Sequence, residues 1–315
     1  MAKVEQNMKK QPPAAAYALL LVAECAIWGF SNAFSKLALD EITPAWCLVI
    51  RYFLSFFLFL AVFGRRFRSK FRREDLKPCV IVSLFTAAAF LLGFVSLAHT
   101  SATNSGFLMS LAVVFAPLLA IPIIGTRFRW MLLLPVLIAA AGLFLFSGGN
   151  LTSLRIGDVY AILCSFASAL MLVTSGKYLK KTDPVVLCVI QCAVCFFVCL
   201  FAALAFEPLP DIAGFSPIVW YVIAVLAIGC TFLAYYFQNT ALARVSPTFG
   251  AMVFCTEPIF TAACAYFLLG ERMGPLGYAG AALILFGISL AGVFEGRSKD
   301  AAEAGPSAAD AGERL

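Results

Sequence analysis

Charged residues are scarce in this sequence. Lys, Arg, Asp and Glu together make up 13% of its 315 residues, whereas 62% are hydrophobic, and soluble domains carry about 25% charged residues. This composition excludes a water-soluble globule, and the mean hydropathy of +0.94 agrees. The charges form short clusters, and the apolar stretches between them reach the roughly 20 residues that a helix needs to cross a bilayer.

Histidine occurs only once, and the motifs H-E-x-x-H and G-x-x-x-x-G-K-[ST] are both missing. These absences argue against a zinc-dependent intramembrane protease and against an ATP-driven pump within this chain. Four of the 11 cysteines, Cys188, Cys192, Cys195 and Cys199, follow one another at helical spacing. Because no His or carboxylate joins this stripe, we interpret it as packing residues and not as a soft-metal site. No enzyme, metal or cofactor is expected.

Ten apolar segments are predicted to cross the membrane as helices. They lie at residues 15–37, 43–63, 78–99, 102–124, 130–147, 157–176, 184–206, 216–238, 246–269 and 275–294. The polar segment 1–14 before them is predicted to be a cytoplasmic tail. The stretch 295–315 after them is rich in Ala, Gly, Ser and charge, which favours a disordered cytoplasmic tail.

Basic residues indicate the orientation. With the N-terminus in the cytoplasm, most of the 23 Lys and Arg fall in cytoplasmic segments, and only Arg155 and Arg272 fall in outer loops. This bias is the positive-inside pattern of membrane proteins. It predicts a multi-pass protein of the plasma membrane, a bacterial inner membrane, with both termini in the cytoplasm. The basic residues behind the net charge of +6 therefore act as orientation signals. They do not indicate nucleic-acid binding, and no nucleic-acid partner is expected.

The two halves of the sequence repeat each other. With a shift of 145 residues, Ser101-Ala-Thr103 aligns with Ser246-Pro-Thr248. The repeat predicts two five-helix units, at 15–147 and 157–294. Because five is an odd number, the second unit starts on the opposite side of the membrane, and such inverted repeats are typical of secondary transporters. The expected fold is therefore an all-α integral membrane protein of ten transmembrane helices, arranged as two inverted five-helix repeats.

Short motifs in each half follow a known order. The first half contains Trp28-Gly-Phe-Ser-Asn32, Thr43-Pro44 and Arg51, and the second contains Glu257-Pro258. In order and spacing these motifs resemble the EamA family of the drug/metabolite transporter superfamily, over nearly everything except the tails. Thr126 departs from the pattern, because it stands where the family's loop glutamate would be.

The resemblance implies ten helices, cytoplasmic termini and a central cavity lined by helices one to four and six to nine. It also implies that the fifth and tenth helices lie at the periphery, where a homodimer contact is one option. The family exports amino acids, other metabolites and some drugs, so the resemblance implies export without naming the cargo.

Polar residues share one face of the first helix. Glu24, Trp28, Ser31 and Asn32 recur at helical spacing, which places them on the same side. At about 1.5 Å per residue, Glu24 lies near the middle of the membrane, where a carboxylate is costly and marks function. We interpret this face as a substrate or proton site. The alternative is a polar contact between helices.

Glu257 is also predicted near the midplane, in the ninth helix, and Pro258 removes a backbone N–H beside it. This pair is interpreted as a gate or a kink at the binding site, with a structural pairing as the alternative. Arg51 either binds a substrate carboxylate, neutralises an acid such as Glu24, or reaches the interface. We favour an acidic partner inside the protein.

The eighth predicted helix carries a second polar stripe, which consists of Thr231, Tyr235, Gln238 and Asn239. We expect Thr231 and Tyr235 to face the transport path. Gln238 and Asn239 lie near the cytoplasmic end, where capping of the helix is the simpler expectation.

These features predict a secondary transporter that exports a small polar, amino acid-like metabolite across the plasma membrane by alternating access. The expected partners are the small-molecule substrate and the lipid bilayer, with proton exchange through Glu24 or Glu257 as the coupling. A lipid flippase or another non-transport membrane protein is the alternative, and an intramembrane enzyme is a weaker one.

Overall fold

The computed structural model of this chain describes residues 14–36, 38, 41–99, 105, 108–125, 130–146, 155–269 and 274–303. Within these ranges every regular element is a helix, which confirms the predicted all-helical fold. The elements are α2 (Ala14–Lys36), α3 (Pro44–Lys70), α4 (Arg73–His99), α6 (Ala112–Ile124), α7 (Trp130–Phe146), α8 (Ile156–Tyr178), α9 (Pro184–Phe206), η1 (Ile212–Gly214), α10 (Pro217–Val225), η2 (Leu226–Leu233), α11 (Ala234–Leu242), α12 (Pro247–Phe254), α13 (Glu257–Leu269) and α14 (Pro275–Glu303).

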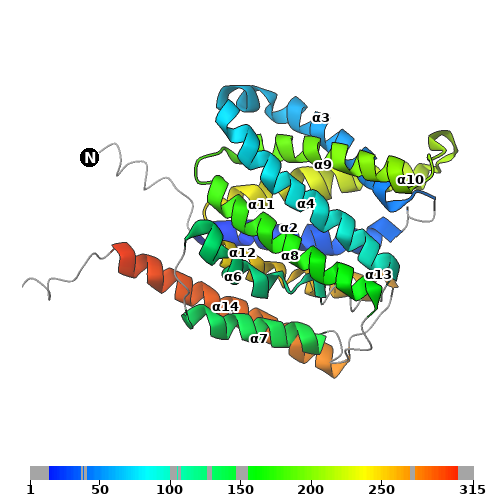
Figure 1. Cartoon of the computed structure of the whole chain (residues 1–315). Helices are drawn as coiled ribbons and strands as arrows, with labels where there is room; N and C mark the ends of the chain where they lie inside the picture. The colour runs from blue at the N-terminus through cyan, green and yellow to red at the C-terminus, as the bar shows by residue number, and fades with distance from the viewer. Residues whose placement is uncertain are drawn as a thin grey trace, which may run out of the picture.

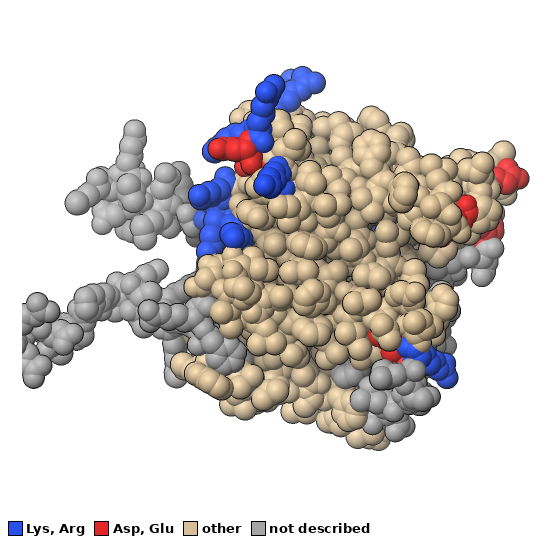
Figure 2. All heavy atoms as spheres, viewed as in Figure 1, with Lys and Arg blue, Asp and Glu red and all other residues tan. Residues whose placement is uncertain are grey.

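Five helices of the described residues are long and apolar enough to cross a membrane. They are α3, α4, α8, α9 and the continuous run from α10 through η2 to α11, and shorter apolar helices lie within α2, α6, α7 and α14. The middle of the face drawn in Figure 2 is almost free of charge, and most of its visible Lys and Arg gather at the left end. Length, composition and surface charge therefore all fit a bilayer environment.

The helices lie side by side and pack in pairs (Figure 1). α3 packs against α9, α4 packs against α8 and α9, and α2 packs against α11 and α13. α7 and α14 pack against each other at one edge of the molecule. The cysteine stripe of α9 is fully buried in the core that α9 forms with α3 and η2, where the thiols act as small packing groups.

The ninth predicted span, 246–269, is not one continuous helix. α12 ends before Cys255, and α13 begins at Glu257. Between them the Thr256 amide donates to a carbonyl three residues back at 2.9 Å, which is a tighter turn than an α-helix makes. Pro258, in the first turn of α13, has no N–H with which to continue the bonding of α12. A full interruption thus replaces the expected continuous helix.

Other boundaries also differ from prediction. α3 ends at Lys70 and not at residue 63, and α4 begins at Arg73 and not at residue 78. α6 begins at Ala112, inside the predicted span 102–124, whose first part lies largely outside the described residues. The eighth span continues to Leu242, and its centre, η2, is a π-helix. α14 runs to Glu303, so the helix continues past residue 295, where the disordered tail was predicted to begin. The helix continues because Lys, Ala and Glu are good helix formers.

α3 and α9 are antiparallel and are tied together where α3 begins and α9 ends. The Glu207 carboxylate follows α9 and accepts a hydrogen bond from the Thr43 hydroxyl at 2.5 Å. It also accepts from the backbone amides of Ala45 at 3.0 Å and Trp46 at 3.2 Å. These amides belong to the first turn of α3, which has no internal acceptors for them. Glu207 therefore caps α3, and its negative charge interacts favourably with the positive end of the helix dipole.

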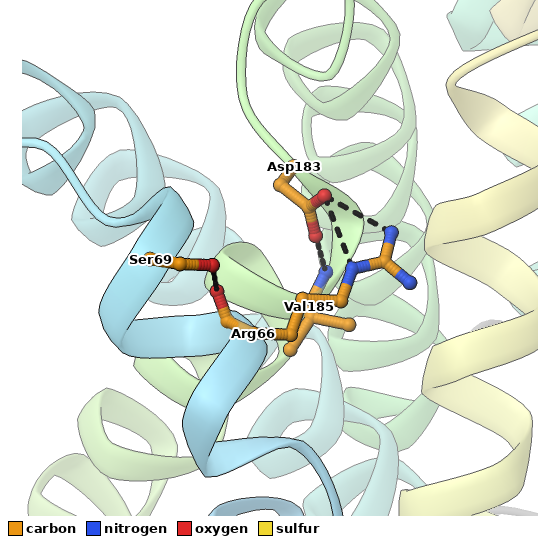
Figure 3. Close-up of polar contacts among 4 residues, drawn as sticks. All are labelled: Arg66, Ser69, Asp183 and Val185. Carbon is orange, nitrogen blue, oxygen red and sulfur yellow. Dashed lines mark hydrogen bonds and ion pairs between the residues drawn. The ribbon is translucent and has the colours of Figure 1, made fainter.

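The opposite ends of the same two helices are joined by an ion pair (Figure 3). Near the end of α3, the Arg66 guanidinium donates from Nε at 3.2 Å and from Nη2 at 3.0 Å to Asp183 Oδ2. The other oxygen, Asp183 Oδ1, accepts from the Val185 amide at 2.9 Å, so Asp183 also caps α9. One helix pair is thus fastened at both of its ends by a carboxylate at a helix N-terminus.

A second loop contact lies on the same side as Glu207. The Glu41 carboxylate accepts from the Ser216 backbone amide at 2.9 Å and from the Ser216 hydroxyl at 2.7 Å. These two bonds lower the pKa of Glu41 from its ordinary value of 4.5. The loop before α3 and the loop before α10 therefore hold each other.

Glu41→Gln should remove a small, pH-dependent part of the stability. Because the pKa of Glu41 is lower in the folded state, its contribution is complete well above pH 4.5 and is lost as the pH falls through the folded-state pKa. We expect the difference in thermal midpoint between wild type and Glu41→Gln to shrink on acidification in detergent solution. Glu74→Gln, at an exposed surface pair, is the control, and a difference that grows at low pH would contradict the assignment.

Gly280→Val should separate α14 from α7. A Cβ atom at Gly280 would lie 2.5 Å from the Gly142 carbonyl oxygen of α7, which is closer than atoms pack. We expect a loss of about 1–3 kcal/mol, the usual cost of overpacking, measured as a lower thermal midpoint. Ala282→Val, at an exposed position two residues away on the same helix, should leave the midpoint unchanged. Equal midpoints for the two variants would show that the helices are not in this contact.

Candidate functional site

A buried carboxylate lies at the centre of the candidate site. Glu24 of α2 has no exposed surface, and its Oε1 accepts a hydrogen bond from Gln238 Nε2 of α11 at 3.3 Å. Its second oxygen, Oε2, is buried and has no hydrogen-bond partner among the described residues, and the same is true of Gln238 Oε1. Buried polar atoms of this kind are rare and require an explanation.

A second buried chain of amides begins at the next residue of α11. Asn239 Nδ2 donates to Gln191 Oε1 of α9 at 3.0 Å, and Gln191 Nε2 donates to the Thr86 hydroxyl of α4 at 2.7 Å. All three side chains are fully or almost fully buried. Gln238 and Asn239 were expected to cap a helix end, and that expectation was wrong. They connect α11 to α2 and α9 instead, and Gln191 extends the connection to α4.

Arg51 joins α3 to the π-helix η2. Its Nε donates to the Thr231 hydroxyl, and its Nη2 donates to the Cys230 carbonyl at 2.8 Å. The guanidinium also lies over the ring of Phe90, 5.6 Å from its centre, where a cation is attracted to the aromatic face. Arg51 is 4% exposed, so it does not reach the interface.

The part of the chain that the structure describes offers Arg51 no acidic partner. Among the described residues no carboxylate lies within 4.0 Å of Arg51. A hydroxyl and a carbonyl satisfy the guanidinium instead, and the carbonyl is accessible because η2 departs from α-helical geometry. The Cys230 carbonyl accepts a second side-chain bond, from Trp28 Nε1 of α2, at 2.8 Å.

Aromatic rings surround these contacts. The hydroxyls of Tyr52 and Tyr235 lie 2.8 Å apart and hydrogen bond to each other. Trp28 packs edge-on against Phe90, with ring centres 5.9 Å apart, and against Tyr235 at 6.3 Å. α2, α3, α4 and α11 thus place four aromatic side chains around one buried arginine.

Glu257 begins α13, which packs against α2, the helix that carries Glu24. The approach of α13 to α2 depends on Gly29, where a Cβ atom would lie 2.8 Å from the Thr261 amide nitrogen. Pro258 lies in the first turn of α13, directly after the interruption of the helix. The interruption between α12 and α13 therefore lies where α13 packs against α2.

Two residues of the predicted face of α2 have different outcomes. The Ser31 hydroxyl donates to the Trp28 carbonyl of its own helix at 2.9 Å, so one of its bonds is local. The side chain of Asn32 lies outside what the structure describes. The structure thus brings together Trp28, Arg51, Thr231 and Tyr235 from the predicted set, and it adds Tyr52 to them. Glu24 bonds separately to Gln238, and Thr86 and Gln191 form a further buried chain with Asn239.

Sequence reasoning gave too little weight to the amides. Gln191 stands in an apolar segment of α9 with no charged residue from 184 to 206, and this isolation is the signal that could have identified it. An amide in such a segment must find a partner inside the protein. Tyr52 and Thr86 carry no comparable signal, because single hydroxyls are common in membrane helices.

A family profile matches both halves of the chain, and two relatives are described as transporters. Residues 15–148 and 155–293 each match the sequence profile of the EamA-like transporter family. Two relatives from Archaeoglobus fulgidus, each described as an uncharacterized transporter, are 25% identical over 274 residues (86% of this chain, 83% of the relative) and 28% identical over 280 residues (86% and 96%). A solved crystal structure has the same fold, with a TM-score of 0.74 and 16% identity over 90% of this chain and 98% of the other.

Thr231→Val and Arg51→Lys should each destabilise the protein, and their effects should not add. Lysine cannot reach the hydroxyl and the carbonyl with one rigid fork, and each variant should cost about 1–3 kcal/mol, as hydrogen bonds to charged groups do. The measurement is a double-mutant cycle on thermal unfolding in detergent. Thr231→Ser, which keeps the hydroxyl, should remain near wild type. Fully additive losses would mean that the two side chains are not coupled.

Proposed function

Because the chain belongs to the EamA-like transporter family, we propose that this membrane transporter exports a small polar, amino acid-like metabolite across the plasma membrane by alternating access. The observation that carries the proposal is the buried carboxylate of Glu24, with one oxygen that no described residue binds. A charged group at membrane depth faces a cavity or a partner inside the protein, and a substrate ammonium group is such a partner.

The spacing of the helices supports two matching five-helix units. α6 and α13 contain 13 residues each and begin 145 positions apart, at Ala112 and Glu257. α7 and α14 also begin 145 positions apart, at Trp130 and Pro275. This distance equals the shift of the sequence repeat. α3 and α9, the second long helix of each unit, run antiparallel, as inverted units require.

The binding region in this proposal lies between α2, α3, η2 and α11. Glu24 binds the amino group of the substrate, and the orphaned oxygens of Gln238 and Asn239 accept further hydrogen bonds from it. Trp28 and Tyr235 provide aromatic walls. Arg51 holds the π-helix in place and is available to a substrate carboxylate only by exchanging one of its present partners.

The interruption before Glu257 and Pro258 supports a moving element. Discontinuous helices are typical of transporter binding sites, because free backbone groups there face a polar cavity. Glu257 begins α13, which packs against the helix that carries Glu24, and intramembrane carboxylates commonly serve in proton relays. We assign proton exchange to this pair of carboxylates. In the proposed orientation both chain termini lie in the cytoplasm. The α7–α14 pair, at the edge of the molecule, is the surface proposed for a homodimer.

The test is uptake into proteoliposomes from a panel of labelled amino acids, with and without a pH gradient. Glu24→Gln keeps the size of the side chain but removes the charge. We expect it to reduce saturable uptake at least about tenfold, which corresponds to about 1.4 kcal/mol of binding free energy.

Cys25→Ala is the matched control, since Cys25 is equally buried on the same helix and its thiol donates to the Val253 carbonyl. It should transport at nearly the wild-type rate. Equal uptake by Glu24→Gln and Cys25→Ala would remove Glu24 from the binding site. Saturable uptake that ignores the pH gradient would remove the proton coupling but keep the transporter.

A further inference from the structure

A basic pocket of about 400 Å³ is lined by none of the residues of the candidate transport site. It is formed by the end of α3, the turn before α4, the loop between α8 and α9, and one face of α11, with Tyr17 of α2 at its edge. In Figure 2 this end of the molecule carries most of the visible Lys and Arg. Its volume falls within the usual range for small-molecule sites.

The charges around the pocket are strongly unbalanced. Its lining contains one acidic residue, Asp183, and six basic residues, which are Arg66, Lys70, Arg72, Lys180, Lys181 and Arg244. Asp183 is already bound by Arg66, and Arg72 pairs with the exposed Glu74. Among the described residues no carboxylate lies within 4.0 Å of the three lysines. Counting the ion pairs of the described residues, the pocket therefore retains a net positive charge.

A polar group inside the pocket also needs a partner. The Thr240 hydroxyl oxygen of α11 is buried and has no hydrogen-bond partner among the described residues. Thr240 and Tyr236, one helical turn apart, both line the pocket. They lie on the opposite face of α11 from Gln238, which turns toward Glu24.

Topology alone does not account for this arrangement. The positive-inside rule requires basic residues in cytoplasmic segments, but it does not require them to converge on a cavity. Arg68, near the end of α3, and Lys77, in the first turns of α4, are also exposed but do not line the pocket. The lining residues differ from them in surrounding a hollow of molecular size.

We propose that this pocket binds a phosphate-bearing anion. Arginine and lysine side chains converging from several elements suit a group with several charged oxygens, and the Thr240 hydroxyl can donate to one of them. The phosphate belongs either to a soluble phosphorylated compound or to the headgroup of an anionic lipid. None of the residues assigned to the transport path lines the pocket, so the proposal does not rest on the proposed function.

Two probes test the proposal on the full chain. Inorganic pyrophosphate is titrated calorimetrically against protein in uncharged detergent, and retained lipid is counted by native mass spectrometry after release from phosphatidylcholine nanodiscs that contain phosphatidylglycerol. We expect saturable binding of at least one probe. Pyrophosphate binding that phosphatidylglycerol does not displace identifies a soluble ligand, whereas tight retention of phosphatidylglycerol identifies the lipid.

Matched double variants separate the pocket from general surface charge. Lys70→Gln with Lys181→Gln should weaken binding at least about tenfold, because both lysines line the pocket. Arg68→Gln with Lys77→Gln removes the same charge outside it and should have little effect. Thr240→Val, which leaves the charge unchanged, should also weaken binding. Absence of saturable binding for both probes, or equal losses in the two double variants, would overturn the proposal.

Discussion

Every polar group at membrane depth must find its hydrogen-bond partner inside the protein, since hydrocarbon offers none. This constraint organises the centre of the structure. Arg51, Glu24, Gln191 and Asn239 all lie in or beside long apolar helices, and all are buried. Their partners come from other helices, so each bond also fixes the position of one helix against another. The polar cluster therefore provides both the candidate site and part of the packing.

Two departures from regular helix geometry lie next to these buried polar groups. The π-helix η2 presents the Cys230 carbonyl to both Trp28 and Arg51, and the interruption before Glu257 lies where α13 packs against the helix that carries Glu24. Irregular backbone is tolerated at membrane depth only where it is buried in protein or lines a cavity. Both irregular segments pack against α2. α2 is therefore the helix that connects them at the site.

The sequence was sufficient for the helices but not for the pairings. Apolar length and basic clusters predicted most helix boundaries within a few residues, and helical spacing placed Glu24 and Trp28 on an interior face. The partner of Arg51 could not be predicted, because a π-helix is created by tertiary contacts that no local pattern records. Ser31 shows the same limit: periodicity gave its side of the helix, but not the bond of its hydroxyl to the Trp28 carbonyl.

The contacts at the two ends of the α3–α9 pair differ in their chemistry, and one end is therefore easier to release than the other. At one end Glu207 accepts hydrogen bonds from neutral groups, whose strength depends little on ionic strength. At the other end Arg66 and Asp183 form an ion pair with the arginine side chain 43% exposed, and exposed pairs are weakened by salt. Arg66 also lines the basic pocket. An anion bound there competes with Asp183 for the guanidinium, so occupancy of the pocket acts on the end of the pair that is easier to release.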